Sequence, residues 1–204
     1  MKKTIPLLRL KYTKNEKKNI SKGLGEILSS GFLTMGKKVI QFEELFAKFI
    51  GTKYAVAVNS GTSALEISLR ALNVKGKSII VPTNTFMATA LATIHAGAKV
   101  IFADVSKENL SIDPLELEKK IVSSTVGVIP VHIGGIISPQ WNEIKKVCKK
   151  NNLFILEDAA HAHGSKIQNH NAGTLGVAAA FSFYPTKILN TGEGGMITTN
   201  DRSL

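Results

Sequence analysis

Short apolar runs alternate with segments of helical period along most of the chain. The runs lie at 54–58, 78–81, 99–103, 126–131, 153–156, 178–183 and 196–199. Strands that are buried on both faces form such unbroken apolar runs, and parallel strands need crossover connections that are usually helices. The alternation therefore predicts an α/β fold, a three-layer α/β/α sandwich around a mostly parallel mixed sheet.

The segments between these runs carry signals for helices. Phe42 to Ile50 has apolar residues at helical spacing and is followed by Gly51, a residue type common after the last turn. Asp113-Pro114 with Glu116 marks a helix start, because Asp caps the first turn and Pro fits the first helical position. Further helices are predicted after the turn at 59–63, at 85–95, and from 138 to 148.

The length and composition are those of an ordinary globular domain. The chain has 204 residues, of which 44% are hydrophobic and 20% charged, so it can bury one sizeable core. Cys148 is the only cysteine, which excludes a disulfide within the chain and fits a reducing compartment. The net charge is +11, but the lysines are not interleaved with aromatic residues as stacking on nucleic acid requires. We therefore expect a lysine-rich surface and no nucleic-acid partner.

The amino-terminal residues are not interpreted as a signal peptide. Lysines precede the apolar residues Ile5 to Leu8, but this stretch is short and Arg9 interrupts it. No apolar run in the sequence is long enough to span a bilayer. We therefore expect a cytoplasmic protein without a membrane partner.

Three polar clusters each follow the end of a predicted strand. They occupy residues 59–63, 158–163 and 182–187. Ligands of open α/β sheets bind outside the carboxyl ends of the strands. We therefore expect the three clusters to meet in one binding site.

The first cluster contains Ser60, Gly61 and Thr62, between a strand and a helix. Backbone N–H groups at a helix start, together with hydroxyls, bind phosphate groups. The alternative is that Ser60 or Thr62 only caps the helix. Neither a P-loop sequence nor a GxGxxG dinucleotide sequence is present.

Asp158 and Lys187 belong to the other two clusters. Asp158 ends an apolar strand, where a buried carboxylate could pair with a cationic ring nitrogen or could merely cap the following turn. Lys187 precedes the glycine-rich residues 192–195, whose backbone could approach a bound group closely. A partly desolvated lysine amine has a lowered pKa and can attack an aldehyde, whereas most loop lysines are exposed and inert. Phosphate site, carboxylate and lysine together indicate pyridoxal 5′-phosphate (PLP) as the cofactor.

Five stretches of the sequence carry a resemblance to a known family. The chain resembles the fold-type-I, PLP-dependent sugar aminotransferases of the DegT/DnrJ/EryC1/StrS family in GFLTMGKKVIQFEELFA, YAVAVNSGTSALEISLRAL, VPTNTFMATA, EDAAHAHG and FSFYPTKILNTGEGGMITTND. The resemblance extends from Ile5 to Asp201. Because complete members of the family are longer, it implies that residues 1–204 form the PLP-binding large domain without the small C-terminal domain. This domain would include an N-terminal helical segment of about residues 1–50.

The resemblance also implies roles for individual residues. Lys187 would bind the cofactor aldehyde as a Schiff base and later act as general base, and Asp158 would pair with the ring nitrogen. Phe86 would stack on the ring unless it is a core aromatic, and His161 would lie near the ring hydroxyl unless it is a structural histidine. Gly61, Thr62 and Ser182 would bind the phosphate. The predicted cofactor-binding residues are Ser60, Gly61, Thr62, Phe86, Asp158, His161, Ser182 and Lys187.

The reaction that the resemblance implies is reversible transamination. An amino acid, glutamate in this interpretation, loads the cofactor, and the amine passes to a keto group of a nucleotide-linked sugar for cell-surface polysaccharide or amino-sugar biosynthesis. Family members of this kind form homodimers whose sites are completed across the interface. Sugar dehydratase relatives carry histidine in place of Lys187, which argues against dehydration. His132-Ile133-Gly134-Gly135 departs from a His-Leu-aromatic-Gly pattern frequent in the family, so the substrate stays open, a cyclitol ketone included.

The sequence allows two interpretations outside this enzyme class. Asp158, His161 and His163, with His170 nearby, offer ligands of the types that bind metal ions. A metal enzyme would leave Lys187 and the phosphate cluster unexplained. The other alternative is a non-catalytic or inactive, truncated chain with the PLP fold.

Overall fold

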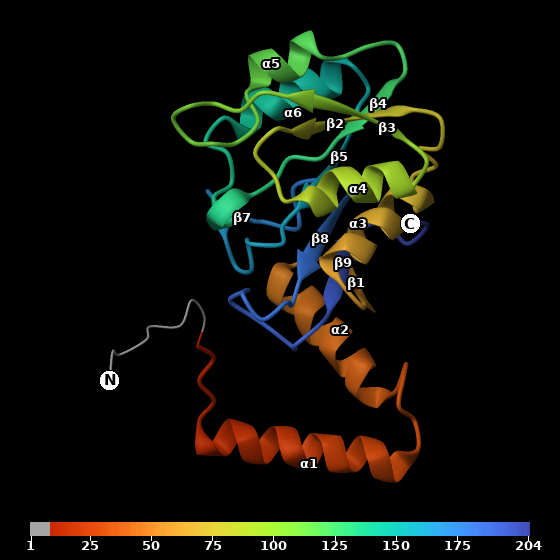
Figure 1. Cartoon of the computed structure of the whole chain (residues 1–204), viewed down its shortest axis with the longest axis vertical. Helices are drawn as coiled ribbons and strands as arrows, with labels where there is room; N and C mark the ends of the chain where they lie inside the picture. The colour runs from red at the N-terminus through yellow and green to blue at the C-terminus, as the bar shows by residue number, and fades with distance from the viewer. Residues whose placement is uncertain (1–8) are drawn as a thin grey trace, which may run out of the picture. The chain divides into compact units, whose positions relative to one another are not determined.

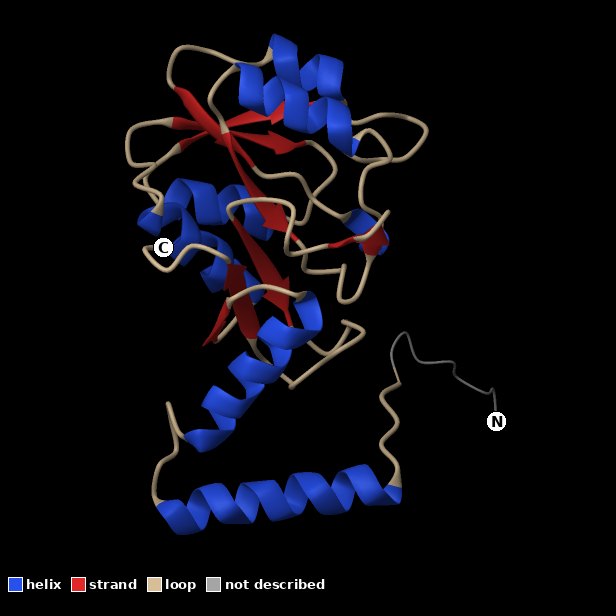
Figure 2. Cartoon of the chain, turned by 180° about the vertical axis from the view of Figure 1, so that it is seen from behind, coloured by secondary structure: helices blue, strands red, loops and turns tan. Residues whose placement is uncertain are grey.

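The computed structural model describes residues 9–204, which divide into two compact units. One unit ends at Phe42, and the other comprises Glu43–Leu204. Figures 1 and 2 show the helices and strands from opposite sides. Residues 1–8 lie outside the described residues, and with them the start of the family resemblance at Ile5 and the short apolar stretch from Ile5 to Leu8.

Helix α1 (Lys14–Ser30) is the main element of the first unit. Thr13 and Glu16 form a capping box at its start, since Thr13 N donates to Glu16 Oε2 over 2.6 Å and Glu16 N donates to Thr13 Oγ1 over 3.2 Å. Helix α2 (Lys37–Ile50) begins in this unit and continues into the second. The predicted N-terminal helical segment consists, where it is described, of these two helices. Neither they nor any other helix within residues 9–204 has the length and apolar composition that crossing a bilayer requires.

A seven-stranded sheet forms the centre of the second unit. Its strands are β1 (Tyr54–Val58), β2 (Ser78–Pro82), β3 (Lys99–Ala103), β4 (Thr125–Val128), β5 (Phe154–Asp158), β8 (Ala178–Ser182) and β9 (Gly195–Thr199). Their order across the sheet is β1-β9-β8-β5-β4-β2-β3. The five strands from β8 to β3 pair in parallel, whereas β9 runs antiparallel to both of its neighbours. The mostly parallel mixed sheet predicted from the sequence is therefore confirmed.

Helices cover both faces of this sheet (Figures 1 and 2). They are α3 (Gly61–Ala71), α4 (Met87–His95), α5 (Pro114–Lys119) and α6 (Trp141–Lys150). Helices α3 and α4 pack on each other and share a buried core with Ile79 and Val81 of β2. Ile80 lies between these two residues and is buried on the opposite face, the side of α5 and α6. This is the predicted three-layer α/β/α sandwich.

Several element boundaries differ from the sequence prediction, α4 and β4 among them. Helix α4 begins at Met87 rather than at residue 85, because Phe86 has extended backbone angles of φ −69° and ψ 143°. Strand β4 ends at Val128 rather than at Val131, which makes only an isolated bridge. Pro130 has no N–H to give to a ladder, so it interrupts the pairing that the apolar run predicted.

Three short elements are not predicted from the sequence. Strand β6 (Lys166–Ile167) pairs antiparallel with β7 (His170–Asn171), and η1 (Ile133–Gly135) is one turn of 3₁₀-helix. These pieces are shorter than the runs from which a periodic pattern can be recognised.

The start of helix α6 also differs from the prediction. It begins at Trp141 rather than at Ser138, because the Ser138 hydroxyl accepts a hydrogen bond from Gln140 N in the turn before the helix.

Glu157 is a fully buried carboxylate near the end of β5. Its Oε1 accepts from the backbone N–H groups of Leu175 and Gly176 over 2.7 and 2.9 Å, and its Oε2 accepts from Gly173 N over 2.8 Å. His132 Nε2, also buried, lies 3.0 Å from Oε2. These bonds tie the turn before β8 to β5, and so fix the spacing of two strands that end at the same edge of the sheet.

Replacing Glu157 with glutamine should lower the free energy of unfolding by about 2–4 kcal/mol, because a buried amide nitrogen would face N–H donors and the charge-assisted bonds would be lost. Glu118→Gln is the matched control. Glu118 is half-exposed and bonds Lys150 Nζ over 2.8 Å, a contact that water screens, so this variant should change little. Urea unfolding followed by circular dichroism measures both, and equal midpoints for the two variants would contradict the role given to Glu157.

Candidate active site

The three polar clusters of the sequence meet around one pocket in the second unit. The pocket has a volume of about 860 Å³. It lies at the carboxyl ends of β1, β2, β5 and β8, the edge at which ligands bind in open α/β sheets. All the residues predicted to bind a cofactor line it, namely Ser60, Gly61, Thr62, Phe86, Asp158, His161, Ser182 and Lys187.

The first cluster lies at the start of α3. Ser60 is the N-cap residue and its Oγ accepts from Ser63 N over 3.1 Å, so the capping interpretation describes this side chain. Gly61 packs so closely on the end of β8 that an added Cβ would lie 2.9 Å from Ser182 Cβ. The first N–H groups of a helix have no intrahelical partner. Together with the nearby hydroxyls of Thr62 and Ser182, they suit a bound anion.

Asp158 is buried at the end of β5, with 6% of its surface exposed. Its Oδ2 accepts from the Thr89 hydroxyl over 2.7 Å, and its Oδ1 accepts from Ala160 N over 3.2 Å. The second bond is that of a turn cap, which was the alternative interpretation, but Asp158 also lines the pocket. A carboxylate held in this way can pair with a cationic nitrogen of a ligand.

Lys187 lines the pocket from the loop after β8. Burial lowers the pKa of the Lys187 amine below its ordinary value, and the negative charge of Asp158 opposes this shift. The backbone N of Lys187 donates to Tyr184 O over 2.9 Å, which closes a turn beyond the strand. A lowered pKa leaves more of the amine unprotonated, and therefore nucleophilic, at neutral pH.

The glycine-rich run after Lys187 brings backbone segments close together. An added Cβ at Gly195 would lie 2.2 Å from Ser60 O, so the start of β9 passes directly against the start of α3. Gly192 has a φ of 85°, which glycine adopts without strain. The sequence predicted that the backbone of these glycines approaches a bound group closely. In the structure, the backbone of Gly195 approaches the start of α3 closely instead.

His161 is held in one tautomer. Gly134 N donates to His161 Nδ1 over 3.2 Å, so the neutral ring carries its proton on Nε2. Burial lowers the pKa of His161, the charge of Lys187 lowers it further, and Asp158 partly opposes both. The ring is hydrogen-bonded, as the structural interpretation proposed, and it also lines the pocket.

Phe86 stands at the pocket rim, immediately before α4. It is 74% exposed, so the alternative interpretation as a core aromatic is wrong. Because the ring lines the pocket and is open to solvent, it can stack on a planar ligand.

His163 lies among aromatic rings rather than in the pocket. Its ring centroid is 5.4 Å from those of Phe181 and Phe183 and 6.3 Å from that of Phe46. Burial lowers the pKa of His163 to about 4, although the backbone of Ser182 opposes the shift. Within residues 9–204, no group of three or more His, Cys, Asp or Glu side chains is placed to hold a metal ion. The described residues therefore give the metal-enzyme interpretation no support.

Part of the pocket wall and its supports are not among the residues predicted from the sequence. Asn84 and Thr85 follow β2 and line the pocket, and the rule about strand ends would have found them. His132 lines the pocket too, within the stretch that departs from the family pattern. Thr89 bonds Asp158 from inside α4, where no sequence signal separates it from other threonines.

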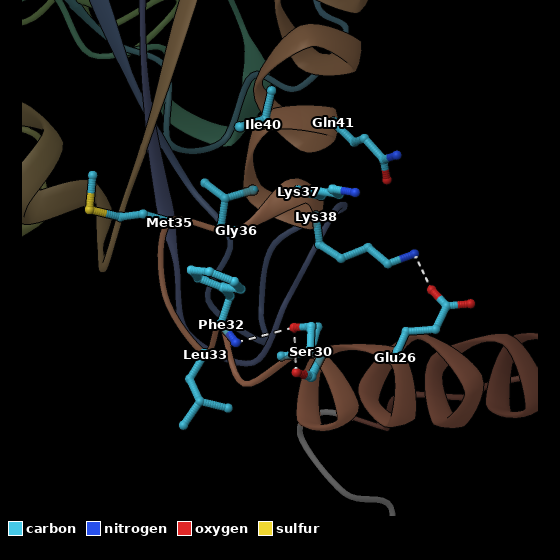
Figure 3. Close-up of a pocket in the computed structure, with 12 residues that line it drawn as sticks. Glu26, Ser30, Phe32, Leu33, Met35, Gly36, Lys37, Lys38, Ile40 and Gln41 are labelled. Carbon is cyan, nitrogen blue, oxygen red and sulfur yellow. Dashed lines mark hydrogen bonds and ion pairs between the residues drawn. The ribbon is translucent and has the colours of Figure 1, made fainter.

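A second hollow, of about 590 Å³, lies within the first unit, between Glu26 and Gln41 (Figure 3). Phe32 and Met35 on its wall are 74% and 89% exposed. Its ion pair joins Lys38 Nζ to Glu26 Oε2 over 2.7 Å (Figure 3). None of the predicted site residues lines this hollow, so the candidate active site is the pocket of the second unit.

Comparison with known proteins identifies the family. Residues 14–204 match the DegT/DnrJ/EryC1/StrS aminotransferase family, so the chain belongs to it and the resemblance is confirmed. The chain is 48% identical over 180 residues to the spore coat polysaccharide biosynthesis protein SpsC of Bacillus subtilis, covering 88% of this chain and 46% of SpsC. It is 39% identical over 172 residues to GDP-perosamine synthase of Caulobacter vibrioides, covering 84% of this chain and 46% of the synthase.

Solved structures show the same fold. Spr1654 of Streptococcus pneumoniae, in its PLP form, superposes with a TM-score of 0.88 at 29% identity, covering 98% of this chain and 54% of that one. The predicted fold class, the large-domain sandwich of fold-type-I PLP-dependent transferases, is confirmed. The chain spans about half the length of the curated relatives it matches.

Competitive labelling with an amine reagent, read by peptide mass spectrometry, should give Lys187 a lower pH midpoint than Lys150. Burial lowers the pKa of Lys187, whereas the hydrogen bond to Glu118 raises the pKa of Lys150. In Asp158→Asn the midpoint of Lys187 should fall further, because the carboxylate charge holds that pKa up. The reverse order of midpoints, or a rise in Asp158→Asn, would contradict this description of the pocket.

Proposed function

We propose that the described residues form the cofactor domain of a PLP-dependent aminotransferase. The enzyme would move an amino group from an amino acid, with glutamate as donor, to a keto group of a nucleotide-linked sugar, in cell-surface polysaccharide or amino-sugar biosynthesis. The observation that carries the proposal is the meeting of Lys187, Asp158 and the start of α3 around one pocket. Membership of the family supports the same conclusion.

The side chains of the pocket fit the functional groups of PLP. The backbone N–H groups of Gly61 and Thr62 at the start of α3, with the Ser182 hydroxyl, would hold the phosphate. Asp158 would pair with the ring nitrogen, Phe86 would cover a face of the ring, and His161 would donate from Nε2–H to the ring hydroxyl. When bound, PLP supplies a positively charged ring that stabilises negative charge on the substrate.

Lys187 would act at two stages. Its unprotonated amine, which burial favours, would condense with the aldehyde, with loss of water, and so fix the cofactor. Once the amino donor has displaced it, the free Nζ would take a proton from the substrate carbon and return one. The negative charge of Asp158 keeps the pKa of this amine from falling further, which suits a group that must both accept and release a proton.

The rest of the pocket wall suits a polar substrate. Asn84, Tyr184, Thr186 and Glu193 line it beside the cofactor residues, and they offer donors and acceptors for the hydroxyls of a sugar. The matched relatives include a GDP-perosamine synthase and a spore coat polysaccharide biosynthesis protein. The proposed substrate class, a nucleotide-linked keto sugar, follows from these two observations.

A cytoplasmic homodimer without nucleic-acid or membrane partners is the proposed form of the protein, on the strength of the family resemblance. Cys148 is buried, and burial raises the pKa of its thiol to about 12, so this cysteine is chemically inert. Sedimentation of the purified chain measures the oligomeric state, and a monomer at high concentration would contradict the dimer proposal.

Borohydride reduction of the chain mixed with PLP, followed by peptide mass mapping, tests the cofactor proposal. We expect a single PLP adduct, on Lys187. It should be lost in Lys187→Arg, which keeps the positive charge but cannot form the bond. Circular dichroism of both proteins is the control for folding. A folded chain with no adduct, or with adducts spread over surface lysines, would overturn the proposal.

Incubation of the PLP-loaded chain with glutamate tests the reaction. We expect 2-oxoglutarate to be released as the PLP absorbance is lost, and the rate to fall by about 10²–10⁴ in Lys187→Arg, the usual contribution of a general base. A chain that forms the Lys187 adduct but converts no amino acid would support the non-catalytic alternative instead.

A further inference from the structure

Helix α4 holds a buried threonine against the carboxylate of the pocket. Thr89 has 0% of its surface exposed, and its hydroxyl donates to Asp158 Oδ2 over 2.7 Å. A hydroxyl–carboxylate bond of this length is charge-assisted and stronger than a bond between neutral groups. It joins α4 to the end of β5 across 69 residues of sequence, so it is a tertiary contact and not part of a local turn.

A second hydroxyl fixes the direction of this bond. Thr85 Oγ1 lies 2.7 Å from Thr89 Oγ1. An ionised carboxylate only accepts and a hydroxyl has one hydrogen, so Thr89 donates to Asp158 and accepts from Thr85, whose other acceptor, Phe86 O, lies farther away at 3.3 Å. Thr85 lines the pocket, so the series of donors runs from the pocket wall through the helix to the carboxylate. Successive hydroxyls polarise one another and strengthen the last bond.

A second hydrogen bond of the carboxylate is longer and local. Asp158 Oδ1 accepts from Ala160 N over 3.2 Å, two residues further along the same turn. The shorter bond from Thr89 is therefore the one that sets the orientation of the carboxylate relative to the rest of the pocket.

The same helix end also carries the exposed ring of the pocket. Phe86 precedes α4, and Thr89 N donates to Phe86 O over 3.1 Å. One turn of backbone therefore links the residue that would cover a planar ring to the residue that holds Asp158. A shift of α4 would move both together.

We propose that Thr89 is a positioning residue that holds the carboxylate of Asp158 toward a cationic ring nitrogen, with Thr85 supporting it. This inference rests on the proposed function, since the ring nitrogen is that of PLP. Thr89 touches neither the substrate nor the cofactor in this proposal and acts only through Asp158.

Thr93 supplies a matched control one turn further along α4. It is as fully buried as Thr89, but its hydroxyl donates to Thr89 O over 3.0 Å, within the helix. Thr→Val at either position removes one buried hydroxyl and keeps the branched shape. Only at position 89 does it remove a bond to Asp158. Thr89→Ser keeps that bond and removes a methyl group.

The test measures the dissociation constant of PLP by absorbance titration, for the wild-type chain and each variant. Thr89→Val should raise the constant by about tenfold, the loss expected for one hydrogen bond to a charged group. It should also raise the pH midpoint of the absorbance change of bound PLP. A misplaced Asp158 would stabilise the positive charge of the ring less, and a less positive ring would repel the proton on the bonded Lys187 nitrogen less, so that this proton would be lost at a higher pH. Thr93→Val and Thr89→Ser should bind as the wild type does, with an unchanged midpoint.

Thr85→Val removes only the supporting donor. It should raise the dissociation constant of PLP by a smaller factor than Thr89→Val does. This second variant keeps the test decisive if Thr89→Val does not fold. The proposal is overturned if Thr89→Val binds PLP as the wild type does, or if Thr93→Val weakens binding equally, because the loss would then belong to helix packing. If the folded wild-type chain does not bind PLP at all, the proposed function fails, and this inference with it.

Discussion

The hydrogen bonds of Glu157 hold the end of β5 in the position on which the pocket depends. Successive strand residues point to opposite sides, so Glu157 and Asp158 turn different ways from one strand end. Glu157 binds three backbone amides of the turn before β8 and the ring of His132. Asp158 faces the pocket and is held by Thr89. The end of β5 thus fixes the position of β8 through Glu157 and presents the negative charge of Asp158 to a ligand.

The charges of the pocket act on one another through a partly desolvated space. Burial lowers the pKa of Lys187, and Asp158 limits that shift. The Lys187 charge in turn lowers the pKa of His161, whose Nδ1 accepts from Gly134 N. The outcome is an available amine beside a fixed carboxylate and a neutral imidazole. These are the complementary groups for a ligand that has an aldehyde, a basic ring nitrogen and a hydroxyl.

The fold could be predicted from the sequence because buried strands leave unbroken apolar runs, and the pocket residues because they follow strand ends. Features that depend on tertiary contacts could not. A short apolar run has no sign of direction, so the antiparallel course of β9 was not predicted. The end of β4 was misplaced at Val131, because Pro130 has the apolar character of the run but lacks the N–H that continued pairing needs. Thr89 and Glu157 look like any other threonine and glutamate until the fold brings their partners to them.

The most direct test of the site is a crystal structure of this chain with PLP bound. Continuous electron density from Lys187 Nζ to the aldehyde carbon is predicted, with the ring nitrogen beside Asp158 and the phosphate at the start of α3. PLP bound outside this pocket, or bound within it with its phosphate beside Asp158, would contradict the assignment of the three groups.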